Sequence, residues 1–192
     1  MVSIRRSSSL PSVGKPPFSS RLADAVFGAH SRRLNKAMQK CVEWHRQQKR
    51  KDGTPYAWHP FAVLANLKAA GVTNKEILIA GLLHDTVEDK HTSYAEVRRL
   101  FGPRVMAIVK EVSKDENGSF NLRTKEGMTV KMADRLHNLF TLEGNDPMWV
   151  KKQIQKSIDL VKKYGTKMEK ANPQLFSDLN MRLTFLRHKY DV

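Results

Sequence analysis

The chain has 192 residues, 40% hydrophobic and 28% charged, and no run approaches the roughly 18 apolar residues of a membrane span, so we expect one globular domain that does not cross a membrane. Its formal net charge of +15 favours a polyanionic ligand, but because aromatic residues are not interleaved with the basic ones we do not expect nucleic acid as the partner. The single cysteine, Cys41, excludes an internal disulfide and a cysteine-based zinc site, and it favours the cytoplasm, where thiols stay reduced.

Residues 1–23 form a tail whose composition predicts disorder. They contain seven serines, three prolines and no acidic residue, and such a segment has too little apolar surface to fold. The Arg- and Ser-rich composition also resembles that of an organellar transit peptide, although a clear amphipathic run is missing. We expect a flexible tail at 1–23 and one domain at 24–192.

The residues after the tail follow a helical pattern. Leu34, Met38, Cys41 and His45 recur at helical spacing, and Cys41 is expected in the core. The segment RKDGTPY at 50–56 predicts a turn, because Gly and Pro interrupt helices. No convincing set of strands and no internal repeat is present, so the expected fold class is an all-α bundle. Further helices are expected at 60–70, 103–113, 125–142, 147–164 and 173–190, with a loop at 114–123.

Two predicted helices begin with a capping box, a hydroxyl residue followed by Glu three positions later. Thr73 pairs with Glu76 in this way, and Ser93 pairs with Glu96. The first box is expected to start a helix that runs through the segment LLHDTVED at 82–89. The second is expected to start the helix that leads into Phe101 and Gly102.

The segment LLHDTVED collects His84, Asp85, Glu88 and Asp89 directly after two leucines. At about 100° per residue, a helix would place these four side chains within an arc of roughly 140°. Three carboxylates so close together repel one another, and burial would raise their pKa values. A divalent cation bound by some of them removes the conflict and leaves the others to handle protons. For this segment alone, a solvated acidic helix end is the alternative.

Two further segments supply matching polar groups. His59 stands in YAWHPF just before a predicted helix, where it could be a fixed ligand, although a capping or packing role is more common. Asp134, Asn138 and Thr141 follow at i, i+4 and i+7 beside an apolar stripe, which predicts a lined pocket. A set of two imidazoles and two carboxylates suits Mn²⁺, Fe²⁺ or Zn²⁺. The members of this set are His59, His84, Asp85 and Asp134.

The motifs of the chain resemble those of a known family. RKDGTPYAWHP, LLHDTVED, FG-x-x-V at 101–105, EVSKD and KMADRLHNLFTL stand in the order found in the hydrolase domain of RelA/SpoT proteins, which belong to the HD phosphohydrolase superfamily. The resemblance covers roughly residues 40–145 and is to the stand-alone form, the small alarmone hydrolases similar to metazoan SpoT homologues. It implies an HD-domain helical bundle with a metal site between helices. The implied reaction removes the 3′-diphosphate of ppGpp or pppGpp, giving GDP or GTP and pyrophosphate.

The same resemblance implies a role for each matching residue. Glu88 and Asp89 would position and activate the attacking water, and Arg50 would pack on the guanine base. The metal, normally Mn²⁺ and one per chain, would be held by His59, His84, Asp85 and Asp134. The guanosine nucleotide would be contacted by Arg50, Lys51, Tyr56, Asn138 and Thr141.

The chain departs from the family pattern at Gln47, where the motif H-x-G-Q-x-R-K usually has Gly. The basic residues that neutralise the diphosphate elsewhere do not align; Lys151, Lys152 and Lys156 are candidates. The metal-binding and water-activating positions are intact, so these departures bear on substrate preference and not on hydrolysis. Two alternative functions are considered beside the family reaction. One is another HD-type phosphohydrolase, acting on nucleoside monophosphates or on the 2′-phosphate of NADPH, and the other is a non-catalytic nucleotide-binding protein. A homo-oligomer is also compatible with the sequence.

Overall fold

The structure is a computed structural model that describes residues 32–51, 53–115 and 118–192. Within these residues it contains helices joined by turns and no β-strand, so the predicted all-α fold is confirmed. The predicted tail at 1–23 and the domain start at 24 lie outside the described residues. The helices are α2 (Arg32–Trp44), α3 (Trp58–Ala69), α4 (Lys75–Leu83), α5 (Tyr94–Phe101), α6 (Pro103–Val112), α7 (Lys125–Phe140), α8 (Pro147–Ala171) and α9 (Pro173–Tyr190).

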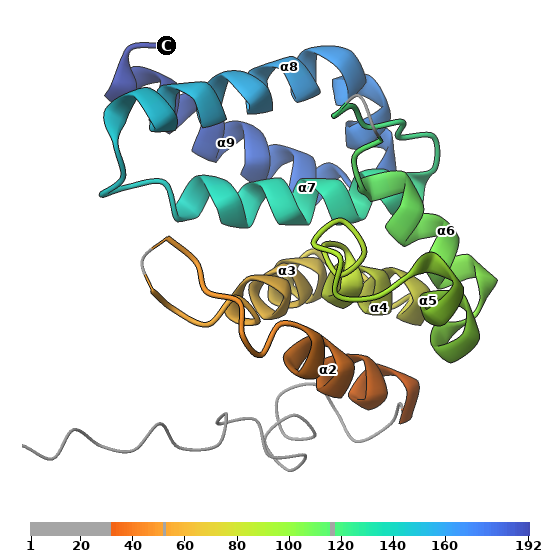
Figure 1. Ribbon diagram of the computed structural model, residues 1–192. Coiled ribbons are helices and arrows are strands. Elements are labelled where there is room, and N and C mark those ends of the chain that lie inside the picture. The colour runs from red at the N-terminus through yellow and green to blue at the C-terminus, as the bar shows by residue number, and fades with distance from the viewer. Residues whose placement is uncertain (1–31, 52, 116–117) are drawn as a thin grey trace, which may run out of the picture.

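Helix α7 lies between two layers of helices (Figure 1). Helices α3 and α4 pack against one side of it, and α8 and α9 pack against the other. Helix α2 covers α4, and α5 packs on α6 beside α4 and α7. This central position explains why ten of the 16 residues of α7 are buried, two of them the ionisable residues Lys131 and Asp134. Because buried charges must be paired, α7 is where a functional site is expected.

Of the two predicted N-cap residues, the structure confirms Ser93 and not Thr73. The hydroxyl of Ser93 accepts a hydrogen bond from the backbone N–H of Glu96 at 3.2 Å, as predicted for the start of α5. The prediction for Thr73 is wrong, because α4 is capped by Asn74, whose Oδ1 accepts from the N–H of Glu76 at 2.9 Å. Asn is at least as favourable an N-cap as Thr, and it stands one residue closer to the helix.

The segment LLHDTVED does not continue the helix as predicted, because α4 ends at Leu83. Both the N–H and the hydroxyl of Thr86 donate to the carbonyl of Leu83, at 3.1 and 2.7 Å. A Thr side chain that bonds to the backbone competes with the helical ladder in this way. The N–H of His91 then donates to the carbonyl of Thr86 at 3.0 Å. Residues 84–91 therefore form a compact coil, in which one helical bond survives, from the N–H of Asp89 to the carbonyl of Asp85 at 2.8 Å.

Helix α8 is longer than predicted, since it continues past Tyr164 to Ala171. Gly165 does not end it, although a glycine inside a helix is locally unfavourable. A Cβ at this position would lie 3.5 Å from the ring of Phe176, an ordinary van der Waals distance, so Gly165 faces α9. Packing against α9 thus outweighs the local preference. Asn172 then ends α8 and caps α9, accepting from the N–H of Leu175 at 3.0 Å.

Two smaller predictions are confirmed. Cys41 is fully buried in the core, and the segment around Gly53 is a turn. The N–H of Tyr56 donates to the carbonyl of Gln48 at 3.0 Å, and that of Gly53 donates to the carbonyl of Arg50 at 3.0 Å. Gly53 has a φ of +84°, a value that favours glycine.

Among the described residues, no helix has the length and apolar character needed to cross a membrane.

Candidate functional site

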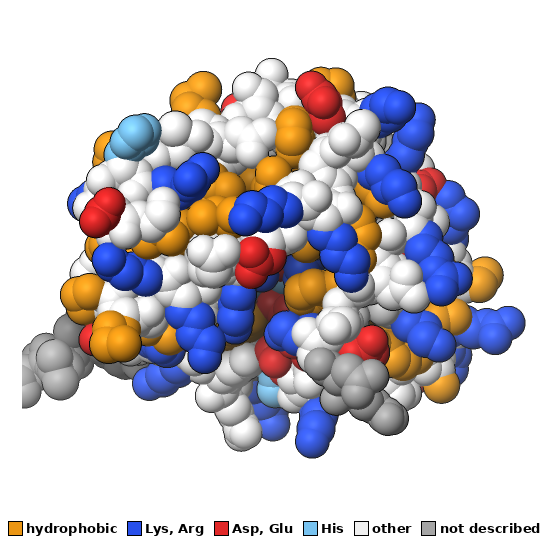
Figure 2. Space-filling view, turned by 90° about the horizontal axis from the view of Figure 1, so that it is seen from above, with side chains coloured by type: hydrophobic (Ala, Val, Ile, Leu, Met, Phe, Trp, Pro, Cys, Tyr) orange, Lys and Arg blue, Asp and Glu red, His pale blue; other side chains and the backbone are white. Residues whose placement is uncertain are grey.

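A polar cavity of about 380 Å³ opens between the turn at 48–56, the coil at 84–91 and the helices α7 and α8. Figure 2 shows Lys and Arg side chains around a hollow in which carboxylates lie recessed. This combination of charges suits a metal ion bound together with a polyanion. The carboxylates in the lining are Asp85, Glu88, Asp89 and Asp134, and the cations are Lys49, Arg50, Lys51, Lys114, Lys131 and Arg135.

The four predicted metal ligands bring their donor atoms together. Nε2 of His59 lies 3.1 Å from Nε2 of His84. Oδ1 of Asp134 lies 3.3 Å from the first of these nitrogens and 3.7 Å from the second, and Oδ2 of Asp85 lies 3.5 and 2.9 Å from them. Two ligand atoms that each lie about 2.1 Å from one metal are roughly 3.0 Å apart when the angle at the metal is a right angle, and roughly 3.4 Å apart when it is tetrahedral. His59, His84 and Asp134 therefore form a group whose spacing fits a divalent metal ion. Asp85 borders this group through its contacts with the two imidazoles.

The two imidazoles are oriented by their other ring nitrogen. Nδ1 of His84 lies 2.8 Å from the carbonyl of Gly81, to which it donates, so that Nε2 keeps a lone pair for a metal. Nδ1 of His59 lies 2.7 Å from Nδ1 of His137. Burial and the neighbouring His59 and Arg50 lower the pKa of His137 to about 4. His137 is therefore neutral at pH 7 and can accept the Nδ1 proton of His59.

The two carboxylates are also held by neighbours. Oδ1 of Asp134 accepts from Nδ2 of Asn138 at 2.6 Å, and its Oδ2 pairs with Nζ of Lys131 at 2.9 Å. Oδ2 of Asp85 accepts from the hydroxyl of Tyr56 at 2.5 Å. Such hydrogen bonds fix the direction in which a carboxylate presents its lone pairs, which is how partners of metal ligands increase metal affinity.

The charges of the site depend on one another. Burial raises the pKa values of Asp85 and Asp134, but His84 beside Asp85 and Lys131 beside Asp134 hold both well below the usual range. Burial lowers the pKa of His84, and the two carboxylates overcome this and raise it to about 10. The carboxylates thus require additional positive charge between them. Either a proton on His84 or a divalent cation can supply it.

The two residues predicted to activate water line the cavity but have different partners. The carboxylate of Glu88 accepts from Nζ of Lys114 at 2.5 Å and from the backbone N–H of Lys114 at 3.1 Å. Oδ2 of Asp89 accepts from Nε2 of Gln48 at 2.8 Å. The coil at 84–91 therefore brings both carboxylates to the cavity without the continuous helix that the sequence predicted.

All five residues predicted to contact the nucleotide line the same cavity. Nη2 of Arg50 donates to the hydroxyl of Thr141 at 2.9 Å, which joins the turn at 48–56 to the end of α7. Nζ of Lys51 lies 3.8 Å from the ring centroid of Trp149, at the start of α8. The other two are Tyr56 and Asn138, which donate to the carboxylates of Asp85 and Asp134.

Several residues of the site were not predicted from the sequence. Lys131 and His137 stand three positions before and after Asp134, and this i±3 spacing on one helix was a signal for both. Lys114 belongs to the EVSKD motif, in which no role was assigned to it. Trp149 carried no signal, because it reaches the cavity from α8 only through the tertiary fold. The cavity lining also includes Phe120, Arg135 and Gln153.

Comparison with known proteins identifies relatives of the chain. Residues 37–126 match a family model described as an HD domain. Guanosine-3′,5′-bis(diphosphate) 3′-pyrophosphohydrolase MESH1 of Mus musculus is 34% identical over 179 residues, which cover 82% of this chain and 100% of the mouse protein. A GTP pyrophosphokinase of Streptomyces coelicolor is 37% identical over 126 residues, which cover 58% of this chain and 15% of that protein. The chain thus spans only a small part of the bacterial relative.

A solved structure agrees with these relatives. It belongs to a metazoan orthologue of SpoT that hydrolyses ppGpp and plays a role in starvation responses. It superimposes with a TM-score of 0.63 and 27% sequence identity, covering 83% of this chain and 96% of that one. The mouse relative is matched along its whole length at 34% identity. The chain therefore belongs to the MESH1 family of HD-domain proteins.

Proposed function

We propose that this protein hydrolyses the 3′-diphosphate of the guanosine alarmones ppGpp and pppGpp, releasing pyrophosphate and GDP or GTP. The observation that carries the proposal is the meeting of two imidazoles and two carboxylates in a cavity lined by six cations. A phosphoryl transfer needs a positioned nucleophile, a cation on the phosphoryl oxygens and positive charge around the leaving group. The mouse MESH1 relative, which carries this activity in its name, supports the same choice.

In this proposal, one divalent ion per chain is held by His59, His84, Asp85 and Asp134. Imidazoles and carboxylates together suit Mn²⁺, Fe²⁺ or Zn²⁺, and we expect Mn²⁺ because of the resemblance to RelA/SpoT hydrolases. A bound ion of this kind lowers the pKa of water and neutralises charge on a phosphoryl oxygen. The protein contributes the orientation of the ligands: Tyr56 and Asn138 hold the carboxylates, and Gly81 and His137 hold the imidazoles.

Glu88 and Asp89 position the attacking water and accept its proton. Both line the cavity, and both have one partner that leaves the carboxylate able to accept a further hydrogen bond. A carboxylate within reach of the nucleophile is a competent general base. The pairing of Glu88 with Lys114 makes it the more strongly neutralised of the two. Asp89, whose side chain accepts from the uncharged amide of Gln48, is the stronger candidate for proton acceptance.

The guanosine moiety binds between the turn at 48–56 and the start of α8. Arg50 offers a planar guanidinium that stacks on a purine better than a lysine would. Lys51 and Trp149 lie together, with the ammonium over the indole ring. They offer the nucleotide a positive charge and an aromatic surface. Asn138 and Thr141 complete this side of the cavity from α7.

The diphosphate groups bind the cations on the opposite side of the carboxylates. Lys114, Lys131 and Arg135 line the cavity, and Nε of Arg135 is buried without a hydrogen-bond partner among the described residues. Lys156 stands near enough to Lys152, Lys114 and Arg135 that, after burial, their charges lower its pKa. This concentration of positive charge favours a ligand that carries several phosphates. Lys151, Lys152 and Lys156, proposed from the sequence for this role, are not among the described residues that line the cavity.

Product analysis tests the proposal. The full chain, loaded with Mn²⁺, is incubated separately with ppGpp, GMP and NADPH, and the products are resolved by anion-exchange chromatography. We expect equimolar GDP and pyrophosphate from ppGpp, and His84→Ala serves as a control for contaminating phosphatases. Orthophosphate released from GMP or NADPH, with ppGpp left intact, would instead assign another HD-type phosphohydrolase. Binding of ppGpp without turnover would assign a nucleotide-binding protein.

Two further assignments belong to this proposal. The lone, fully buried Cys41 is consistent with the reducing cytoplasm as the location, which fractionation of cells checks. A homo-oligomer is compatible with the exposed apolar side chains Phe140, Met148 and Met181. Light scattering of the purified chain measures that state.

A further inference from the structure

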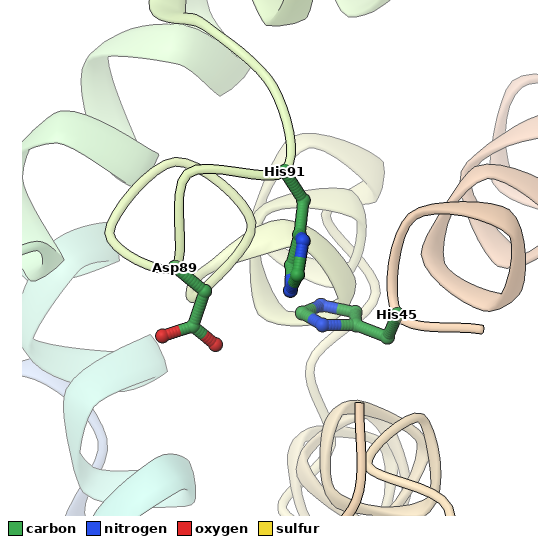
Figure 3. A group of neighbouring side chains, drawn as sticks. All are labelled: His45, Asp89 and His91. Atoms are coloured by element: carbon green, nitrogen blue, oxygen red, sulfur yellow. The ribbon is translucent and has the colours of Figure 1, made fainter. Parts of the chain in front are cut away.

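The side-chain amide of Gln48 contacts three of the ionisable side chains beside the cavity. Its Nε2 donates to Oδ2 of Asp89 at 2.8 Å. Its Oε1 lies 2.6 Å from Nδ1 of His45 and 2.8 Å from Nε2 of His91. Figure 3 shows the rings of His45 and His91 meeting edge to face, with the carboxylate of Asp89 beyond them. His91 has no role in the function argued so far.

The partners leave the amide only one orientation. If it were reversed, its oxygen would face the carboxylate of Asp89 at 2.8 Å, a contact between two acceptors. In the arrangement that remains, His45 donates through Nδ1 and His91 donates through Nε2, both to Oε1 of Gln48. Nε2 of His45 is buried and without a partner among the described residues. This agrees with a tautomer of His45 in which Nδ1 carries the proton.

The backbone on either side of Gln48 is also fixed. Its N–H donates to the carbonyl of His45 at 3.0 Å, and its carbonyl accepts from the N–H of Tyr56 at 3.0 Å. His45 itself is 1% exposed and packs against the ring of Tyr56 at a centroid distance of 5.0 Å. Gln48 thus stands on a rigid base, at the point where the turn at 48–56 closes.

His45, Asp89 and His91 are close enough to be considered a second metal site. The amide of Gln48 argues against this, because its Oε1 occupies the space within 2.8 Å of both imidazole nitrogens. Its amide nitrogen lies between that oxygen and the carboxylate of Asp89. An ion could bind there only if the three hydrogen bonds that the Gln48 amide makes with His45, Asp89 and His91 were broken.

We propose that Gln48, held in one orientation by His45 and His91, is a positioning residue for Asp89. The inference rests on the proposed function, in which Asp89 accepts a proton from the attacking water. Gln48 binds Oδ2 of Asp89 and leaves Oδ1 to take that proton. Because general-base catalysis depends on the direction of the acceptor lone pair, a carboxylate free to rotate would spend less time in the productive orientation.

The inference predicts a loss in kcat without a change in binding. Gln48→Met keeps the length of the side chain and removes the donor, so kcat should fall on the order of 10- to 100-fold, less than the 10²–10⁴-fold expected when the base itself is lost. KM for ppGpp and metal content should stay close to those of the wild type. Tm should fall, because Gln48→Met leaves the buried Nδ1–H of His45 without its acceptor. His91→Leu should give a smaller loss of the same kind, and His91→Gln, which restores an N–H donor, should recover most of it.

A double-mutant cycle with Asp89→Asn decides whether Gln48 acts through Asp89. We expect Gln48→Met to cost less than about twofold in kcat once Asp89 is replaced. If the losses multiply, or if KM rises instead of kcat falling, the inference is wrong while the role of Asp89 stands. If Asp89→Asn turns over like the wild type, the proposed water activation is wrong and the inference falls with it.

Replacing His91 gives a second test of the inference, because His91 is exposed and its replacement should not disturb folding. Metal analysis of His91→Leu should find the same content per chain as in the wild type. A wild-type protein that holds two ions, one of which is lost in His91→Leu, would overturn the inference in favour of a metal at His45, Asp89 and His91.

Discussion

Asn138 connects the metal site to the nucleotide pocket, and Asn138→Ala separates the two roles. Its Nδ2 donates to Oδ1 of Asp134 at 2.6 Å, on the oxygen that also lies 3.3 Å from Nε2 of His59. A hydrogen bond to a charged group contributes about 1.5–3 kcal/mol. Because Lys131 continues to hold the other oxygen of Asp134, we expect a value in the lower half of that range. At about 1.4 kcal/mol per factor of ten, Mn²⁺ affinity should fall roughly 10- to 40-fold.

Competition with a chelator of known affinity measures this change in the wild type and in Asn138→Ala. Thr141→Ala is the matched control, since Thr141 lies on the same side of the cavity and its side-chain partners include no proposed metal ligand. Turnover at saturating Mn²⁺ then separates the roles: recovery of kcat/KM assigns Asn138 to the metal, and a persistent deficit adds a contact with substrate. An unchanged Mn²⁺ affinity would refute the link between Asn138 and the metal site.

Four further predictions concern the other parts of the site. His84→Ala should lose both stoichiometric metal and turnover; metal retained in full by elemental analysis would contradict its role as a ligand. Glu88→Gln and Asp89→Asn should keep the metal and lose kcat, with the full general-base loss of about 10²–10⁴-fold for the residue that accepts the proton; single-turnover rates within a few-fold of wild type would remove both from water activation. Arg50→Ala should cost on the order of 1–3 kcal/mol in kcat/KM for ppGpp, and an equal loss on a substrate without the base would mean that Arg50 binds phosphate. Deleting 1–23 should leave kcat and KM nearly unchanged, and a large rise in KM would show that the basic tail helps to bind substrate.

The helices were predictable where their signals are local. Ser93 caps α5, and Pro173 begins α9, at the positions the sequence indicated. The errors arose where tertiary structure outweighs local preference. The helix predicted at 147–164 stops seven residues short of the observed end of α8 at Ala171, and in that stretch Gly165 lies against Phe176 of α9. At 82–89 the polar pattern was read as a helix, and the bonds of Thr86 to Leu83 turn the chain away instead.

For the site, the sequence predicted which residues meet but not how they are held. His59, His84, Asp85 and Asp134 are indicated by their chemistry and their motifs, and the structure brings them together. The partners of these residues come mostly from other elements, and their residue types are common. His91 illustrates this, because nothing in its local sequence relates it to Gln48, which lies 43 positions earlier. Such contacts appear only when the turn at 48–56 and the coil at 84–91 are brought side by side.

Hydrolysis of ppGpp in ¹⁸O-labelled water tests the central claim, that the site directs a water to the phosphorus next to the 3′ oxygen. Attack at that phosphorus breaks the bond between it and the 3′ oxygen, so the oxygen of water enters the pyrophosphate. With Mn²⁺ bound, we predict by mass spectrometry one ¹⁸O in each pyrophosphate and none in GDP, and no label incorporation when a chelator removes the metal. Labelled orthophosphate as the product, or label in the GDP, would contradict the account.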